Sequence, residues 1–547
     1  MHENSNLSVL VIDPNPGMRG SLQNMLNQAD ITKIEFAVSA GTAIKQLGKR
    51  SYDIILCEYD LGGGGSDGQD GQQLLEDLRH HKLIGLLTIF IMITSEGIYS
   101  KVVSAAELTP TDYILKPFTA DRLLERIARA LEKRNAFMPV YQFMEVGNQR
   151  EGIGACIAGV KAFPRYAIDF LRLRAELHML LGEPAEAEPI YQQLFDAKQI
   201  GWARLGVAKT LFMRERYPEA QAMLEALVEN NKKFVDAYDW LAKAHAAIGE
   251  LEKSQSVLSE AVAVSPHAVR RLRKLGEIAL ETGDTDTAER VLKQVVSKAK
   301  YSEFRDPEDH VKLVQTLVRK GDPVQAAAVI RDLDKSMGGQ KNTSACSAIS
   351  SALVHEYTGN ESRLAESLAA AVAACKDSQG LSSEVKMELA RNCLQNNMEE
   401  GASEVMRDVM RNAPNNAAMT KAMAVFEKAG RGDLAASVAQ ESRQAVVEMV
   451  AAGAAKAKEG DYRGAVALMV EAVNKLPDNP QVVFNAAVAV LKCLENMGWE
   501  ERLGQYALSL IDTVRRLDPV NPKLPALAGL HQQILKKYDK GTRAKKA

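Results

Sequence analysis

The sequence predicts two successive folds: a doubly wound, five-stranded parallel α/β sheet over residues 1–135, and an all-helical repeat superhelix over residues 136–547. In the first part, short apolar and β-branched runs alternate with helical patterns, an order that is typical of parallel sheets. In the second part, a unit of about 33 to 38 residues recurs, with glycine or proline at its turns. Such a repeat is typical of stacked helix pairs.

Five apolar runs are the predicted strands, at residues 7–12, 34–37, 52–61, 86–93 and 112–115. A helical pattern follows most of them, and the last predicted helix covers residues 119–133. Ligands of such sheets bind at the carboxyl ends of the strands. The polar residues that end these strands are Asp13, Glu58, Thr94 and Lys116. We therefore expect an acid, a central carboxylate, a hydroxyl and a lysine to meet at one edge.

These residues, in this order and together with the run Tyr113–Phe118, resemble the receiver (CheY-like) domain of two-component response regulators. The resemblance implies a site where acids bind Mg²⁺, an Asp accepts a phosphoryl group, and a hydroxyl and a lysine contact it. It assigns Asp13 as the remaining metal-binding acid, Glu58 to the phospho-acceptor position, and Thr94, Tyr113 and Lys116 to the switch and readout.

Two residues depart from the receiver pattern. Pro14 stands where a second acid is usual, which should weaken a Mg²⁺ site because Mg²⁺ prefers several oxygen ligands. Glu58 stands where the acceptor is Asp. A glutamate can pair with Lys116 and accept a hydrogen bond from Thr94, and so hold an active-like state without phosphate. It imitates phosphate only in part, because phosphate carries about −1.5 to −2 charges.

The register of the third strand leaves an alternative open. If Asp60 rather than Glu58 were the acceptor, the pair Asp67-Gly68 would fall where receivers often have Asp-Gly. With Glu58 as the acceptor position, the glycine-rich loop at residues 62–71 is longer than usual. We interpret this loop either as a tolerated surface insertion or as a lid over a degenerate site.

The second part resembles tetratricopeptide repeats, most closely at residues 269–302 and 446–479. We expect nine or ten helix pairs and a capping helix at 524–538, with a basic tail. The register is uncertain around 200–234 and 415–445. Stacked pairs form a concave groove that binds peptide segments. The predicted groove residues, among acids such as Asp236 and Asp239, are Trp202, Lys209, Lys243, Arg270 and Arg273. Core packing of Trp202 and a solvated face for the cations are the alternatives.

The composition and the motifs argue against several classes of function. A net charge of −2 argues against a nucleic-acid-binding surface. Six scattered cysteines fit a reducing cytoplasm, and no signal peptide or membrane span is predicted. No catalytic constellation follows residue 135, so we expect a non-enzymatic signalling adaptor. Its expected partners are proteins, with a sensor kinase as one candidate, and neither nucleic acid nor membrane is expected. The alternative is a phosphorylation-dependent regulator that uses Asp60 or a functional Mg²⁺ site. A dimer through residues 97–131 is a further expectation.

Overall fold

The structure, a computed structural model, describes residues 4–62, 70–95, 111–145, 148–198, 200–232, 234–266, 268–299, 305–340, 342–377, 381–518 and 521–544. The chain forms two compact units. The first comprises residues 1–145, 149–179 and 183–309, and the second comprises residues 146–148, 180–182 and 310–547. Residues 63–69 of the proposed lid (62–71) and residues 97–110 of the proposed dimer face (97–131) lie outside the described residues.

A five-stranded parallel sheet begins the first unit, and it confirms the predicted fold class. Its order is β2-β1-β3-β4-β5, and the strands are β1 (Ser8–Ile12), β2 (Lys33–Ala37), β3 (Ile54–Glu58), β4 (Ile89–Ser95) and β5 (Asp112–Lys116). The fourth strand starts three residues later than predicted. The reason is a turn before it, in which the Thr88 amide donates to the Gly85 carbonyl at 3.2 Å.

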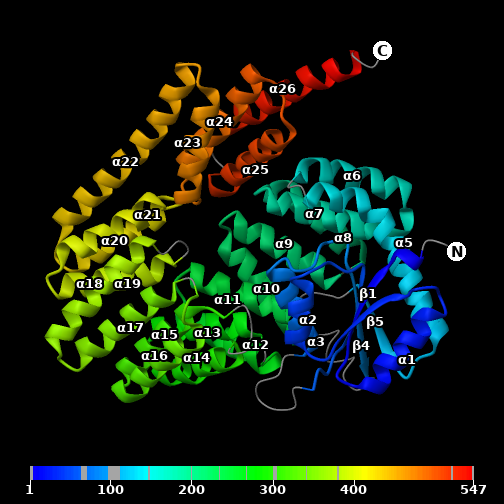
Figure 1. Cartoon of the computed structure of the whole chain (residues 1–547), viewed down its shortest axis with the longest axis horizontal. Coiled ribbons are helices and arrows are strands. Elements are labelled where there is room, and N and C mark those ends of the chain that lie inside the picture. Colours follow the sequence, from blue (N-terminus) through cyan, green and yellow to red (C-terminus); the bar gives the residue numbers. More distant parts are fainter. Residues whose placement is uncertain are drawn as a thin grey trace. The chain divides into compact units, whose positions relative to one another are not determined.

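Helices cover both faces of this sheet (Figure 1). One face packs against α1 (Pro16–Asn27) and α5 (Ala120–Glu145), and the other against α2 (Ala40–Leu47) and α3 (Gly71–His80). Val9 and Val11 point into the first layer, while Leu10 and Ile12 point into the second. Burial on both sides explains why the strands read as continuous apolar runs.

The last helix of the sheet domain runs on to Glu145, beyond the predicted end at Lys133. Its apolar stripe continues through Phe137 and Val140, both of which are buried. The Phe137 ring stacks on the ring of Phe170, with 3.9 Å between the centroids. Burial of this continued stripe stabilises the extra helical turns, so α5 joins the sheet to the repeats without a loop.

Helix pairs make up the rest of the chain. Those of the first unit are α6 (Gln149–Ala162), α7 (Ala167–Leu180), α8 (Pro184–Lys198), α9 (Gly201–Met213), α10 (Tyr217–Asn230), α11 (Val235–Ala247), α12 (Leu251–Val264), α13 (Val269–Thr282) and α14 (Thr285–Ala299). Then follow α15 (Pro307–Arg319), α16 (Pro323–Met337), α17 (Thr343–Tyr357), α18 (Glu361–Asp377), α19 (Ser383–Gln395), α20 (Glu399–Arg411), α21 (Asn416–Lys428), α22 (Gly432–Lys458), α23 (Tyr462–Lys475), α24 (Pro480–Met497), α25 (Glu501–Leu517) and α26 (Leu524–Ala544).

Left-handed turn residues mark the register of the pairs. The turn between α9 and α10 has Glu215 at φ 60°, and the turn between α21 and α22 has Gly430 at φ 73°. They supply the register in the two stretches where the sequence left it uncertain. In the second of these, α22 is a single helix of 27 residues that ends one pair and begins the next. Its interior carries no proline to break it.

Close helix crossings explain the small residues of the repeats. A Cβ on Gly276 of α13 would lie 2.8 Å from the Leu292 side chain of α14. A Cβ on Gly453 of α22 would lie 2.6 Å from the Met469 sulfur of α23. Both contacts are shorter than normal packing, so only glycine allows these helices to approach this closely.

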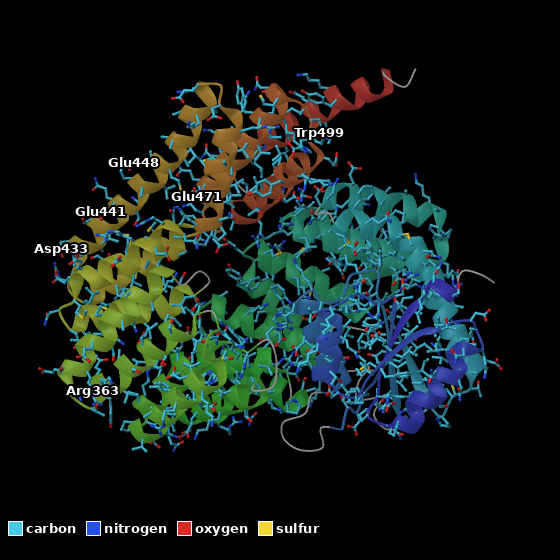
Figure 2. The ribbon with its side chains drawn as sticks, viewed as in Figure 1. Arg363, Asp433, Glu441, Glu448, Glu471 and Trp499 are labelled. Atoms are coloured by element: carbon cyan, nitrogen blue, oxygen red, sulfur yellow. The ribbon has the colours of Figure 1, made fainter. Side chains whose placement is uncertain are left out.

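Acidic side chains follow one another along α22 in the second unit (Figure 2). Each has a polar partner nearby: Asp433 pairs with Arg431 at 3.2 Å, Glu441 with Arg407 at 2.8 Å, and Glu448 accepts from Gln444 at 2.9 Å. Two of these three acids, Asp433 and Glu441, are therefore paired with a cation. In the described part of the chain, no helix is both long and apolar enough to cross a bilayer.

Candidate functional site

Three charged side chains meet at the carboxyl edge of the sheet. Asp13 follows β1, Glu58 ends β3, and Lys116 ends β5. The Lys116 ammonium forms an ion pair with Glu58 Oε2 and lies 3.8 Å from Asp13 Oδ2. Because parallel strands end at the same edge, residues far apart in sequence come together here. The lysine thus sits between two acids.

Both acids of this site are buried. Asp13 is 1% exposed and Glu58 is 8% exposed. Glu58 Oε1 accepts from the Asp60 amide at 3.2 Å, and Asp13 Oδ1 accepts from the Asn15 amide at 2.7 Å. Asp13 Oδ2 is buried and has no hydrogen bond within the described chain. Two buried carboxylates would repel each other, and the positive charge of Lys116 offsets this repulsion.

Asp60 lies outside this cluster. It is exposed, it follows the end of β3, and its Oδ1 accepts from the Gly62 amide at 3.0 Å. The structure therefore places Glu58, rather than Asp60, at the strand end that faces the lysine. The roles of both residues in phosphate chemistry remain predictions.

Thr94 and Tyr113 occupy neighbouring strands. Thr94 is fully buried in β4, and its hydroxyl donates to the Ser95 carbonyl at 3.4 Å instead of to Glu58. The hydrogen bond expected between Thr94 and Glu58 is thus not formed in this structure. Tyr113 pairs in register with Met92 and packs at the edge of the core beside α2 and α3.

Mg²⁺ fits this edge poorly. Asn15, next to Pro14, uses its side-chain oxygen to cap α1, accepting from the Gly17 amide at 2.9 Å. The donors left are the carboxylates of Asp13 and Glu58, and the Lys116 ammonium lies against both. A divalent cation would have to displace that ammonium. Within the described residues, no group of three or more His, Cys, Asp and Glu side chains could hold a metal.

A second polar cluster, which the sequence did not reveal, lies at the opposite edge of the sheet. Asp53 precedes β3 and accepts from the Ser8 amide at 2.9 Å and the Ser8 hydroxyl at 2.8 Å. Arg134 of α5 donates to the same carboxylate at 3.1 Å. Partial burial alone would raise the pKa of Asp53, but these bonds lower it below its ordinary value. The cluster fixes α5 against the sheet.

Ion pairs join the first helices of successive repeats. Lys209 of α9 donates to Asp236 of α11 at 3.0 Å. Arg271 of α13 makes two bonds of 2.8 Å to Asp239 of α11. We call this series the ion-pair ladder. Arg271 is 4% exposed, so water is largely excluded from this step of the ladder, and this burial lowers the pKa of Arg271 to about 10.

Two tryptophans lie beside the ladder. The Arg172 guanidinium of α7 stacks 4.9 Å above the Trp202 ring, which packs partly into the core. The Trp240 ring faces Lys209 at 5.3 Å and Lys243 at 4.2 Å. Sequence reasoning missed Trp240, although Lys243 three residues later on the same helix was a usable signal.

The cations predicted to line a groove therefore differ in the groups that they contact. Arg273 makes two bonds, 2.6 and 2.7 Å, to Asp309, which is 2% exposed. Arg273 and Lys209 thus join helices of the array. Lys243 contacts an aromatic face, and Arg270 lies near Asp239 and Glu76. Partner binding by these residues remains a prediction.

Comparisons with known proteins agree with this architecture. The family model for the response regulator receiver domain matches residues 9–128, and tetratricopeptide repeat models match residues 169–193, 208–254 and 241–303. The chemotaxis protein CheY-3 of Vibrio cholerae is 28% identical over 130 residues, covering 24% of this chain and 95% of the relative. Chemotaxis protein CheY of Pseudomonas aeruginosa is 26% identical over 129 residues, covering 24% of this chain and 99% of the relative.

Solved structures of low sequence identity also match parts of the chain, among them a tetratricopeptide repeat protein. One, from Parabacteroides merdae, is 14% identical, covers 50% of this chain and 98% of that chain, and gives a TM-score of 0.32. The type IV pilus biogenesis factor PilW is 15% identical, covers 38% of this chain and 94% of that chain, and gives a TM-score of 0.31. The family models and the chemotaxis relatives show that the chain carries a receiver domain at its N-terminus, followed by tetratricopeptide repeats.

Proposed function

We propose that this response-regulator-like signalling protein, with its protein-interaction repeats, is a pseudo-response regulator. In this proposal the receiver takes up no phosphate. It is held in one state by the internal ion pair between Glu58 and Lys116, and the protein acts as a non-enzymatic adaptor in the cytoplasm. The observation that carries the proposal is that Lys116 contacts Glu58 directly.

Both oxygens of the Glu58 carboxylate already have a partner. Oε2 pairs with Lys116, and Oε1 accepts from the Asp60 amide. An acceptor must offer an oxygen in line with the incoming phosphorus, and a cation must neutralise the charge that develops there. Here the lysine is already neutralised by Glu58. The extra methylene of glutamate, compared with aspartate, brings the carboxylate to the place where a phosphoryl oxygen would meet the lysine.

The poor Mg²⁺ site also disfavours phosphoryl transfer to this receiver. Receiver chemistry depends on Mg²⁺ held by acids, and Pro14 supplies no oxygen from its side chain. Asp13 alone, with one of its oxygens already bonded to the Asn15 amide, is a weak donor set. The groups that would detect a phosphate, Lys116 and the Thr94 hydroxyl, are therefore present, whereas the pair of acids that would bind Mg²⁺ is not, because Pro14 replaces one of them.

The repeats supply the output in this proposal. Tetratricopeptide helices bind peptide segments of other proteins, and a sensor kinase or another signalling protein is the class of partner that we expect. Near-neutral net charge and paired surface charges favour protein over nucleic acid.

A phosphorylation assay tests the receiver half of the proposal. The full chain is incubated with acetyl phosphate and Mg²⁺, and acid-labile phosphate is measured by intact-protein mass spectrometry. We expect no incorporation in the natural protein. Incorporation that disappears in Asp60→Asn or in Glu58→Gln would overturn the proposal and establish the phosphorylation-dependent alternative.

A matched variant shows that the assay can detect phosphate. Glu58→Asp combined with Pro14→Asp restores the acceptor and the second acid, and we expect this double variant to incorporate phosphate. Glu58→Asp alone should incorporate less, because the metal site stays incomplete. If the natural protein and the double variant incorporate phosphate equally, the ion pair does not block the chemistry.

A further inference from the structure

Two separate apolar cores follow one another along α22 in the second unit. The buried residues of one core run from Val311 to Ala439, and those of the other run from Val446 to Ile534. We call these two parts of the second unit its first half and its second half. Buried apolar packing is what holds helices rigidly together. We therefore expect each half to be firmer within itself than in its connection to the other.

The long helix α22 connects the two halves, and it reaches from α20 and α21 to α23 and α24 (Figure 1). Its middle is fixed to α20 in the first half: the Ser442 hydroxyl donates to the Arg407 carbonyl at 3.4 Å, and Glu441 pairs with the Arg407 guanidinium at 2.8 Å. Between Ser442 and the start of the second core at Val446, no side chain is buried. Residues 443–445 are therefore the part of α22 that neither core holds.

Two hydrogen bonds join the halves at a second point. Asn479 Nδ2 donates to the Arg411 carbonyl at the end of α20 at 2.7 Å, and the Asp478 amide donates to Asn412 Oδ1 at 3.1 Å. Asn479 Oδ1 also accepts from the Val482 amide at the start of α24 at 3.0 Å. Because the last carbonyls of a helix have no partner within it, Asn479 caps the ends of two helices at once. We call the two bonds between the halves the asparagine latch.

The latch is weak compared with the cores on either side of it. The bond between Asp478 and Asn412 is exposed, and the bond between Asn479 and Arg411 is only partly buried. Water can replace such bonds at a small net cost in free energy. Long helices also bend without losing their hydrogen bonds. The two halves can therefore separate at the latch while both apolar cores stay intact.

We propose that the second unit is a hinge: its second half swings about residues 443–445 of α22, and the asparagine latch holds it in the position seen here. A partner that contacts both halves would bind one position of the hinge better than the other, and would shift the population toward that position. This inference goes beyond the proposed function and requires neither phosphate nor the receiver site.

A distance measurement in the full chain tests the hinge. Nitroxide labels are attached to p-acetylphenylalanine at positions 363 of α18 and 496 of α24, so that the native cysteines stay in place. Both positions are exposed, and Figure 2 labels Arg363 in the first half and Trp499, close to position 496 in sequence, in the second. Pulsed electron paramagnetic resonance should give a narrow distance distribution in the natural chain.

The latch variant is Asn412→Ala/Asn479→Ser. Serine keeps the cap of α24 but is too short to reach the Arg411 carbonyl. We expect a broader distribution with a second population, and amide hydrogen exchange in residues 440–446 about tenfold faster, while α23 and α25 stay protected. The matched control is Asn415→Ser, because Asn415 caps α21 within the first half by accepting from the Ala418 amide at 2.9 Å. It should leave the distances and the exchange unchanged.

An unchanged distance distribution in the latch variant would overturn the proposal. If this variant loses protection throughout α23 to α25, its second half unfolds instead of swinging. Asn412→Ala alone, which removes only the exposed bond to the Asp478 amide, is then measured with the same labels. A distribution that stays narrow in this single variant, or that broadens only together with loss of protection in α23 and α25, would likewise overturn the hinge.

Discussion

Gly71 lies directly against the end of the strand that carries Glu58. A Cβ on Gly71 would come within 2.5 Å of the Glu58 carbonyl oxygen and 2.9 Å of the Met92 sulfur. The backbone atom cannot move aside without disturbing β3, so the contact fixes α3 relative to the candidate site. A larger residue at position 71 must push the start of α3 away from the end of β3.

Gly71→Ala should therefore destabilise the receiver domain by about 2 kcal/mol, the usual cost of overpacking. Hydrogen exchange of β3 amides in the full chain measures this loss. Gly20→Ala is the matched control, because no atom lies within 4 Å of a Cβ at that helical position. The control should leave the free energy of unfolding unchanged or raise it by up to about 1 kcal/mol. Equal effects of the two variants would contradict the close contact.

Lys116→Ala should also destabilise the receiver, for an electrostatic reason. It leaves Glu58 and Asp13 buried together without their cation. Loss of one partner of a buried pair costs about 3–5 kcal/mol, and the 28% exposure of the Lys116 side chain reduces our expectation to about 2 kcal/mol.

The control and the rescue distinguish charge from packing. Lys45→Ala removes an exposed lysine of α2 and should change stability by less than about 0.5 kcal/mol. Glu58→Gln added to Lys116→Ala should recover part of the loss, because a neutral amide tolerates burial better than an unpaired carboxylate. Protection of β3 and β5 amides against exchange is the measurement. A double variant no more stable than the single one would argue against the ion pair.

The sheet and the edge that carries the site were predictable from the sequence. The strands are buried on both faces, so they stand out as apolar runs, and the parallel order sends Asp13, Glu58 and Lys116 to one edge. The end of α5 was not predictable in the same way. Its stripe continues at Phe137 because Phe170 of a later helix packs there, and no local pattern names that partner.

The hydrogen bonds and ion pairs of the site and of the repeats were less predictable than its residues. The sequence suggested that Thr94 would donate to Glu58, but its hydroxyl donates to the Ser95 carbonyl at the end of β4. Lys209 and Arg273 were predicted as groove residues but not as members of ion pairs, and Arg271 was not predicted at all. Asp239 and Arg271 are 32 positions apart, close to one repeat length, so the period of the repeat is the signal that could have paired them.

Asp53→Asn should give a stability loss that depends on pH. The folded state lowers the pKa of Asp53, so its contribution is present above the ordinary pKa of about 3.9 and disappears as the pH falls through the folded value. The carboxylate is 37% exposed, which limits the expected loss at pH 7 to about 1 kcal/mol.

Hydrogen exchange of β1 amides, corrected for the intrinsic rate at each pH, measures this difference. The natural protein and Asp53→Asn should converge as the pH falls below the lowered pKa of Asp53 in the folded state. Glu125→Gln is the control: its side chain is 66% exposed and pairs with Arg129 on the same helix, so it should show little dependence. A difference that grows as the pH falls would show that Asp53 is not held as an anion by Ser8 and Arg134.

Arg271→Met should loosen the ion-pair ladder. Arg271 is 4% exposed, and its two bonds to Asp239 span α13 and α11. Methionine keeps much of the volume but leaves Asp239 with no bidentate partner, so we expect a local loss of about 3 kcal/mol, seen as faster exchange of α11 and α13 amides.

Lys274→Met is the control: it changes a neighbouring side chain that is 54% exposed and should cost less than about 0.5 kcal/mol of stability. Asp239→Leu added to Arg271→Met should recover stability, because two packed apolar groups replace a buried pair at little cost. If the double variant is the least stable, the ladder is held by charge that packing cannot replace.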